Sequence, residues 1–242
     1  FRHFEVTQER AGIKIATDSV LLSCLADLVN PRRIRDIGTG TGLLALLSAE
    51  KYPEALVTGV EIEEGAYLDA LGNFAASPYS ERLTAVHGDI RELRDEEFDA
   101  VIVNPPYFTG NSQELRSEER RTARQDATLT DRDLRDAAVR LLREDGIFAI
   151  CLPPLRAPSF LRAAGGVLAP AEEISLIPRE GKEEYLRIIT LRRTGSGATC
   201  ARRTFTVRSA DGSYSREYLE ATDGIFLTRE QKAALRRELG KG

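Results

Sequence analysis

The stretch V-I-V-N-P-P-Y-F at residues 101–108 ends an apolar run on an asparagine, two prolines and two aromatic residues. The prolines fix their own torsions and cannot continue a sheet ladder, so the carbonyl groups around Asn104 are held rigidly. Carbonyl oxygens that accept hydrogen bonds from both N–H groups of a planar NH₂ group would localise the delocalised lone pair on its nitrogen. The ring of Tyr107 would stack on the plane of that group. The motif therefore indicates a site that activates an NH₂ nitrogen, with a simple strand-ending turn as the alternative.

A glycine-rich turn, D-I-G-T-G-T-G at 36–42, is the second chemical feature. Glycines let the backbone turn tightly and approach a ligand that meets the N–H groups of the following helix. Glu61 follows nineteen residues after Gly42, where its carboxylate can accept both hydroxyls of a ribose. The spacing G-x-G-x-G, with Asp36 two residues earlier, favours S-adenosylmethionine over a dinucleotide. Asp89, in the sequence G-D-I, is an acid in reach of an adenine amino group or else a turn residue.

The chain has few residues that could bind a metal or carry out thiol chemistry. His3 and His87 are the only histidines, so a histidine-based metal site or catalytic triad is not expected. Cys24, Cys151 and Cys200 are far apart and form no CxxC pair. We therefore expect isolated thiols in a reducing compartment and no bound metal.

Alternating patterns of strands and helices must position these residues. Strands are expected at five segments: 34–37, 56–61, 83–87, 100–103 and 147–152. Helices are expected at 43–52, 67–74 and 134–142, the last one ended by Gly146 as a C-cap. This alternation predicts an α/β fold with a doubly wound, mostly parallel sheet that binds its ligand at the carboxyl ends of the strands.

The pattern changes beyond Pro153. Strands are expected at 174–177, 185–191 and 204–207, as an antiparallel edge of the same sheet. The sequence T-R-E-Q at 228–231 resembles a capping box that opens a final helix.

The composition fits an ordinary globular protein. The 242 residues are 42% hydrophobic and 30% charged, which suits one large domain or one domain with an appendage. No apolar stretch approaches the roughly 18 residues of a membrane span, and no signal peptide is visible. We therefore expect a cytoplasmic protein that does not contact a membrane, with the oligomeric state open and a monomer favoured.

The motifs together resemble a known family. In order, D-I-G-T-G-T-G, E-I-E-E, G-D-I and V-N-P-P-Y-F look like the amino-group branch of class I S-adenosylmethionine-dependent methyltransferases, which have a Rossmann-like fold. The sequences at 4–22, 73–83 and 123–129 resemble the bacterial tRNA1(Val) (adenine-37-N6)-methyltransferases, and the likeness runs from about residue 4 to 191. The resemblance implies methyl transfer from S-adenosylmethionine to the N6 atom of an adenine in tRNA, adenine 37 of a valine tRNA.

The resemblance also implies a role for individual residues. Donor-binding roles fall on the glycine turn, the acids and the strand-end asparagine: Asp36, Gly38, Gly40, Gly42, Glu61, Asp89 and Asn104. Three residues would close over the donor, or else cap the first helix: Lys14, Thr17 and Asp18. The catalytic residues would be Asn104, Pro105, Pro106 and Tyr107, with Tyr107, Phe108 and Arg124 at the target base. One departure is Gln125, where family members often carry His.

The same resemblance divides the chain into three parts. Residues 1–30 would close over the donor site, residues 31–194 would form the methyltransferase domain, and residues 195–242 would add a C-terminal extension with a strand and a terminal helix.

Contact with RNA must be local, because the whole chain has a net charge of −4. Residues 179–208 carry eight Lys or Arg against three Glu, a net charge of +5, and we expect a cationic rim there. A target in an anticodon loop would be partly unstacked already, which lowers the cost of moving the base into a pocket.

Other functions stay open. The same N-P-P-Y chemistry suits a glutamine amide in a protein. Such enzymes usually carry a separate N-terminal helical domain for their protein partner, and the roughly 30 residues before the first strand count against this alternative. An adenine in DNA and the N2 atom of guanine in ribosomal RNA are lesser alternatives. A non-catalytic module that binds S-adenosylmethionine or RNA is the third class.

Overall fold

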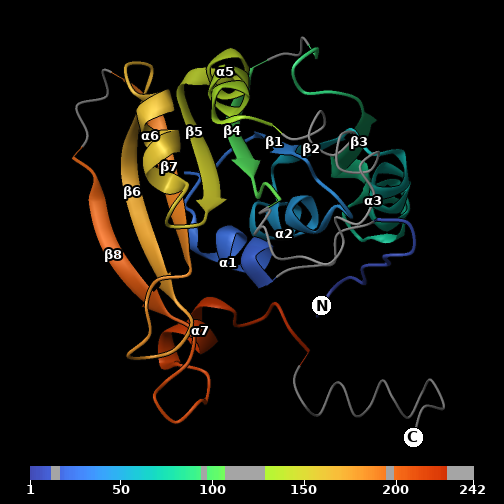
Figure 1. The fold of residues 1–242 in the computed structure, drawn as a ribbon. Coiled ribbons are helices and arrows are strands. Elements are labelled where there is room, and N and C mark those ends of the chain that lie inside the picture. The colour runs from blue at the N-terminus through green and yellow to red at the C-terminus, as the bar shows by residue number, and fades with distance from the viewer. Residues whose placement is uncertain (12–16, 94–96, 107–128, 195–198, 228–242) are drawn as a thin grey trace, which may run out of the picture.

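The computed structural model describes residues 1–11, 17–93, 97–106, 129–194 and 199–227. One eight-stranded sheet runs through this part of the chain, with the strand order β3-β2-β1-β4-β5-β7-β6-β8 (Figure 1). The strands are β1 Arg33–Ile37, β2 Leu56–Glu61, β3 Leu83–His87, β4 Phe98–Val103, β5 Leu142–Leu152, β6 Leu168–Ile177, β7 Leu186–Arg193 and β8 Ala201–Thr206.

The fold prediction is confirmed, with one refinement at the C-terminal edge. The pairs among β1 to β5 are parallel, and β7 runs antiparallel to both β5 and β6. The last strand, β8, pairs with β6 in parallel, so the antiparallel pairing comes from β7 alone. The terminal helix predicted from residue 228 lies outside the described residues.

Helices cover both faces of the sheet (Figure 1). The helices are α1 Thr17–Leu25, α2 Leu43–Lys51, α3 Glu64–Ala76, α5 Asp131–Leu141, α6 Ala157–Ala164 and α7 Arg216–Ala221, with a short 3₁₀ turn, η1 Ser80–Arg82. Buried apolar side chains of α1, α2 and α3 contribute to one cluster, and those of α5 and α6 contribute to a second cluster. None of the described helices is long and apolar enough to span a membrane.

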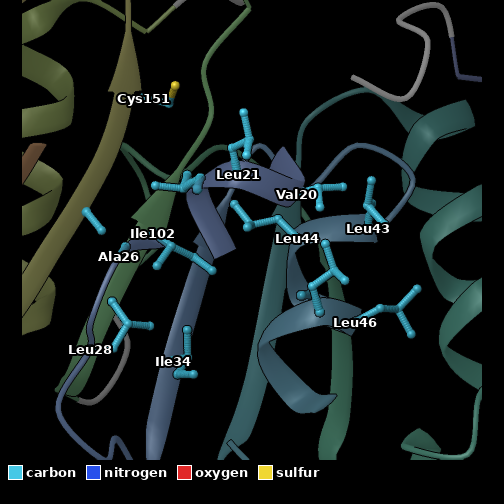
Figure 2. Close-up of a cluster of buried hydrophobic side chains, with 14 of the residues drawn as sticks. Val20, Leu21, Ala26, Leu28, Ile34, Leu43, Leu44, Leu46, Ile102 and Cys151 are labelled. Atoms are coloured by element: carbon cyan, nitrogen blue, oxygen red, sulfur yellow. The ribbon is translucent and has the colours of Figure 1, made fainter. Parts of the chain in front are cut away.

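The central strand β4 shows why the sheet is buried on both sides. Its run V-I-V places Ile102 in the first cluster, and Val101 and Val103 in the second. Figure 2 shows Leu21 of α1 and Leu44 of α2 above Ile34 and Ile102 of the sheet. A strand covered on both faces is a continuous apolar run, so it does not show the alternation of a half-exposed strand.

The predicted helix cap at Gly146 is wrong. Helix α5 ends at Leu141 and β5 begins at the next residue. The register between β4 and β5 then shifts, since Phe98 pairs with Leu142 but Ala100 pairs with Ile147. A Cβ atom on Gly146 would lie 3.2 Å from the backbone oxygen of Asp99. The glycine therefore permits a close approach at this bulge.

Arg82 joins the end of α2 to the sheet. Its guanidinium donates to the carbonyls of Ala49, Tyr52 and Ala55 at 2.8, 3.2 and 3.0 Å. The same group lies 5.5 Å from the centre of the Tyr79 ring. One cation thus bonds a carbonyl in the last turn of α2, that of Ala49, and two carbonyls in the connection from α2 to β2.

We predict that Arg82→Met lowers the free energy of unfolding by about 1–3 kcal/mol, because three partly buried carbonyls lose a charged donor. Urea denaturation followed by circular dichroism measures this change. Arg32→Met is the matched control, since Arg32 pairs with Glu54 at the surface and both side chains are more than 70% exposed. Its effect should stay within about 0.5 kcal/mol. Equal effects of the two variants would contradict the assigned role of Arg82.

Candidate active site

The candidate site lies at the carboxyl ends of the parallel strands. The turn after β1 contains the glycines, Glu61 ends β2, Asp89 follows β3, and Asn104 follows β4. Because β2, β1 and β4 are adjacent and parallel, Glu61, the glycine turn and Asn104 share one edge of the sheet. This is the edge at which open α/β sheets bind their ligands.

The glycine turn has left-handed backbone at all three glycines, with φ of +66° at Gly38, +57° at Gly40 and +84° at Gly42. A Cβ atom on Gly42 would lie 2.4 Å from the ring of Phe74 in α3. A Cβ atom on Gly38 or Gly40 would meet nothing within 4 Å. The turn is therefore packed against α3 at Gly42 but leaves open space beside Gly38 and Gly40, as a bound donor requires.

Asp36 lies beneath this turn and is 1% exposed. Its carboxylate accepts a hydrogen bond of 2.6 Å from the hydroxyl of Thr39. Burial raises the pKa of Asp36 to about 7, and the nearby charge of Glu61 acts in the same direction, while the Thr39 hydroxyl opposes both. Asp36 thus shapes the turn from within the core, and its charge depends on pH near neutrality.

Glu61 links β2 to the glycine turn. One carboxylate oxygen accepts from the backbone N–H of Gly40 at 2.8 Å, and the other accepts from the N–H groups of Ile62 and Glu63 at 2.9 and 3.0 Å. A carboxylate offers about four lone-pair sites, so ribose hydroxyls can still be accepted beside these bonds. The next side chain, Ile62, is 40% exposed and offers an apolar surface for a flat ring.

Asp89 is held by Arg91. The Arg91 guanidinium and backbone N–H donate to the Asp89 carboxylate, and this hydrogen bonding lowers the pKa of Asp89. The carboxylate is therefore charged at neutral pH and can accept from an amino group. Its predicted contact with adenine stays a prediction.

Asn104 is oriented by α1. Its side-chain nitrogen donates to the hydroxyl of Ser19 at 2.9 Å. Pro105 is buried and Pro106 is exposed. Three further residues predicted here lie outside the described residues: Tyr107, Phe108 and Arg124. The structure thus brings the beginning of α1 to the strand end on which the N-P-P-Y motif begins.

The residues predicted to close over the donor are described in part. Thr17 and Asp18 form the first turn of α1, and burial raises the pKa of Asp18. Lys14 lies outside the described residues. Through Ser19, this first turn is next to Asn104, so two predicted parts of the site are adjacent.

The basic segment 179–208 does not form one rim. Three of its arginines pair with acids: Arg187 with Glu173 and Glu184, Arg202 with Glu173, and Arg203 with Glu172. Arg192 and Arg193 end β7 at the amino edge of the sheet, whereas Arg179 and Arg208 follow β6 and β8 at the carboxyl edge. The structure thus divides these charges between both edges of the sheet.

Several residues of the site were missed from the sequence. Ser19 follows Thr17 and Asp18 directly, and that position is the signal that could have indicated it. Asp69 and Asn73 bind the N-terminal segment, and Asn73 also binds the glycine turn. Their only sequence signal is two polar residues on the apolar face of a helix. Among the described residues, no cluster of His, Cys, Asp or Glu could hold a metal ion.

Comparisons with known proteins agree with this geometry. The family model for the methyltransferase small domain matches residues 10–152. A tRNA1(Val) (adenine(37)-N6)-methyltransferase from Aeromonas hydrophila is 35% identical over 230 residues, which cover 94% of this chain and 96% of the relative. The protein of the same name from Yersinia pseudotuberculosis is 33% identical, over 94% of this chain and 91% of the relative.

Solved structures show the same fold. The crystal structure of a predicted O-methyltransferase from Agrobacterium tumefaciens has a TM-score of 0.68 at 21% identity, over 86% of this chain and 96% of that chain. The structure of TrmN from Thermus thermophilus has a TM-score of 0.54 at 24% identity, over 72% of this chain and 48% of that chain. The glycine turn, the strand-end acids and the Asn-Pro-Pro motif thus occur in a chain that belongs to the methyltransferase small domain family and to the family of tRNA1(Val) (adenine(37)-N6)-methyltransferases.

Proposed function

We propose that this protein transfers the methyl group of S-adenosylmethionine to the exocyclic N6 atom of adenine 37 in a valine tRNA. The observation that carries the proposal is the position of Asn104-Pro105, which follows β4 beside the glycine turn of β1. The names of relatives that match over 94% of the chain support the choice of substrate.

The chain is an S-adenosylmethionine-dependent methyltransferase. When bound, this donor supplies an electrophilic methyl group. The open space beside Gly38 and Gly40 would receive it, and the Glu61 carboxylate would accept its ribose hydroxyls. Asp89 would accept from its adenine amino group, and Thr17 and Asp18 would lie over it.

Asn104 would activate the acceptor nitrogen without acting as a base. Its side-chain oxygen and a backbone carbonyl fixed by the prolines would accept hydrogen bonds from the two N–H groups of the adenine amino group. These bonds draw the nitrogen toward tetrahedral geometry and localise its lone pair. Because Ser19 accepts from the amide nitrogen of Asn104, the amide oxygen is the atom presented on the other side. Tyr107 and Phe108 would stack on the base, and Arg124 would contact the RNA.

The enzyme would recognise its substrate mainly by the shape of the RNA and by an unpaired base. A base in an anticodon loop is partly unstacked, so its transfer into a pocket costs less than from a duplex. The net charge of −4 requires local contacts with the phosphates. We assign residues 1–30 to donor closure, 31–194 to catalysis and 195–242 to the C-terminal extension, and we place the protein in the cytoplasm, where tRNA is modified.

The direct test uses radiolabelled S-adenosylmethionine with a panel of unmodified tRNA transcripts, followed by nucleoside analysis. We expect N6-methyladenosine in a valine tRNA, and loss of the label when adenine 37 is replaced by guanine. Label on protein and in no tRNA would overturn the proposed substrate in favour of a glutamine amide.

We predict that Asn104→Ala lowers the rate of methyl transfer by about 10²-fold or more, since an acceptor that orients the nitrogen is lost. Calorimetric affinity for S-adenosylmethionine should change little. Asn30→Gly is the control, because Asn30 lies in an exposed turn with φ of +50° at the opposite edge of the sheet. Transfer by Asn104→Ala at the wild-type rate would disprove the catalytic role of Asn104.

We also predict a pH dependence that comes from Asp36. Its folded-state pKa of about 7 lies above the ordinary value of 3.8, so the folded protein binds more protons than the unfolded chain between these values. The contribution of Asp36 to the free energy of unfolding must therefore fall as the pH rises from about 4 to 7, by an amount on the order of 1 kcal/mol per pH unit.

The measurement is urea denaturation of wild type and Asp36→Asn at several pH values. Asp36→Asn should show a flatter dependence over the same window, and the difference between the two proteins isolates the contribution of Asp36. Parallel curves for the two proteins would show that Asp36 does not titrate there.

A further inference from the structure

Residues 7–11 lie along α3 and are held by two of its side chains. Asp69 and Asn73 are four residues apart, so they lie on one face of the helix, and each is 4% exposed. Residues 7–11 have no regular secondary structure of their own. Their position is therefore determined by contacts with α3.

Asp69 accepts hydrogen bonds from three successive backbone N–H groups. Its Oδ2 atom lies 3.2, 2.8 and 2.8 Å from the nitrogens of Glu9, Arg10 and Ala11. The guanidinium of Arg10 donates to its Oδ1 atom at 3.3 Å. Burial alone would raise the pKa of Asp69, but these donors outweigh burial and hold that pKa below its ordinary value. The carboxylate is thus a charged anchor for a curved stretch of backbone.

Asn73 links the same segment to the glycine turn. Its Oδ1 accepts from the N–H of Thr7 at 2.8 Å, and its Nδ2 donates to the carbonyl of Thr7 at 2.9 Å. The second Nδ2 hydrogen goes to the carbonyl of Thr41 at 2.8 Å. Thr41 lies between Gly40 and Gly42, so one buried amide bonds both the segment and the turn.

The helix surface is shaped for this contact. A Cβ atom on Gly65, in the first turn of α3, would lie 3.1 Å from Cβ of Arg10 and 3.3 Å from its carbonyl oxygen. A side chain at position 65 would require the neighbouring atoms to shift by a few tenths of an ångström. The same helix begins three residues after Glu61, the acid bonded to Gly40.

We propose that Asp69 and Asn73 are positioning residues for donor binding, because they fix residues 7–11 and the carbonyl of Thr41 in one arrangement. The inference rests on the proposed donor site at the glycine turn. Docking of residues 7–11 and binding of S-adenosylmethionine then depend on the same turn geometry. Each must strengthen the other by the same factor.

Asp69→Asn tests this coupling, since it keeps the size of the side chain and removes its charge. We expect the Kd for S-adenosylmethionine, measured by calorimetry without RNA, to rise about tenfold. The KM for S-adenosylmethionine should rise in parallel, while kcat at saturating donor stays within twofold. A general loss of folded enzyme would lower the apparent kcat instead.

Asp99→Asn is the matched control. Asp99 also accepts from two backbone N–H groups, those of Arg32 and Arg33, and from the guanidinium of Arg143. It lies at the amino end of β4, at the opposite edge of the sheet. The affinity of the Asp99→Asn variant for S-adenosylmethionine should remain within twofold of wild type. Equal weakening by both variants would reduce Asp69 to a general stabilising role and overturn the proposal.

Thr7→Pro is the second variant, in case Asp69→Asn does not fold. It removes the N–H group that donates to Asn73 and leaves the sequence of α3 unchanged. We expect the same rise in the Kd for S-adenosylmethionine. Amide hydrogen exchange gives an independent readout in the wild-type protein. The N–H groups of residues 7, 9, 10 and 11 should exchange more slowly with saturating S-adenosylmethionine than without it.

The outcomes separate this inference from the proposed function. The coupling would be overturned by a Thr7→Pro variant that binds the donor with normal affinity. It would also be overturned if amide hydrogen exchange at residues 7–11 were the same with and without the donor. Wild type that binds the donor but methylates no tRNA would refute the proposed substrate and leave the coupling intact. Wild type that binds no donor would refute both.

Discussion

The tight reversal of the chain at Gly38–Gly42 is the constraint on which the rest of the site depends. Its backbone adopts torsions that favour glycine, and it passes so close to Phe74 that a side chain at Gly42 has no room. Around it the structure assembles polar partners from separate elements: Asp36 from β1, which accepts from Thr39 of the turn, Glu61 from β2, and Asn73 from α3. The proposed donor site is thus a turn of the backbone whose conformation is held by side chains from neighbouring elements.

The proposed acceptor side depends on the orientation of one side chain and not on a turn of the backbone. Asn104 is a polar side chain at the end of a buried strand, and its amide needs an orientation as well as a position. The hydroxyl of Ser19 supplies one partner for the amide nitrogen from the first turn of α1. Helix α1 is itself held by Lys51, whose ammonium donates to the carbonyls of Ser23, Cys24 and Ala26 at its C-terminal end. The proposed donor and acceptor sides are therefore connected through α1 and α2.

Electrostatics explain why a protein of net negative charge can serve an RNA substrate only through local contacts. Most arginines of the segment 179–208 are occupied by glutamates or by backbone carbonyls, and they stabilise the C-terminal strands. An arginine paired with a glutamate offers little net attraction to phosphate, whereas one bonded to a carbonyl keeps its full charge. The segment 179–208 therefore offers less attraction to RNA than its composition suggests.

Local spacing and apolar runs were enough to predict the eight strands, the helices α2, α3 and α5, the glycine turn, and the places of Glu61 and Asn104 at strand ends, but no range was predicted for α1, α6 or α7. The sequence also predicted a helix cap at Gly146, since a glycine after an amphipathic run looks the same whether it ends a helix or permits a bulge. Asp69, Asn73 and Ser19 became visible only in the tertiary structure. Their partners lie 32 to 85 residues away, and no local pattern records such a contact.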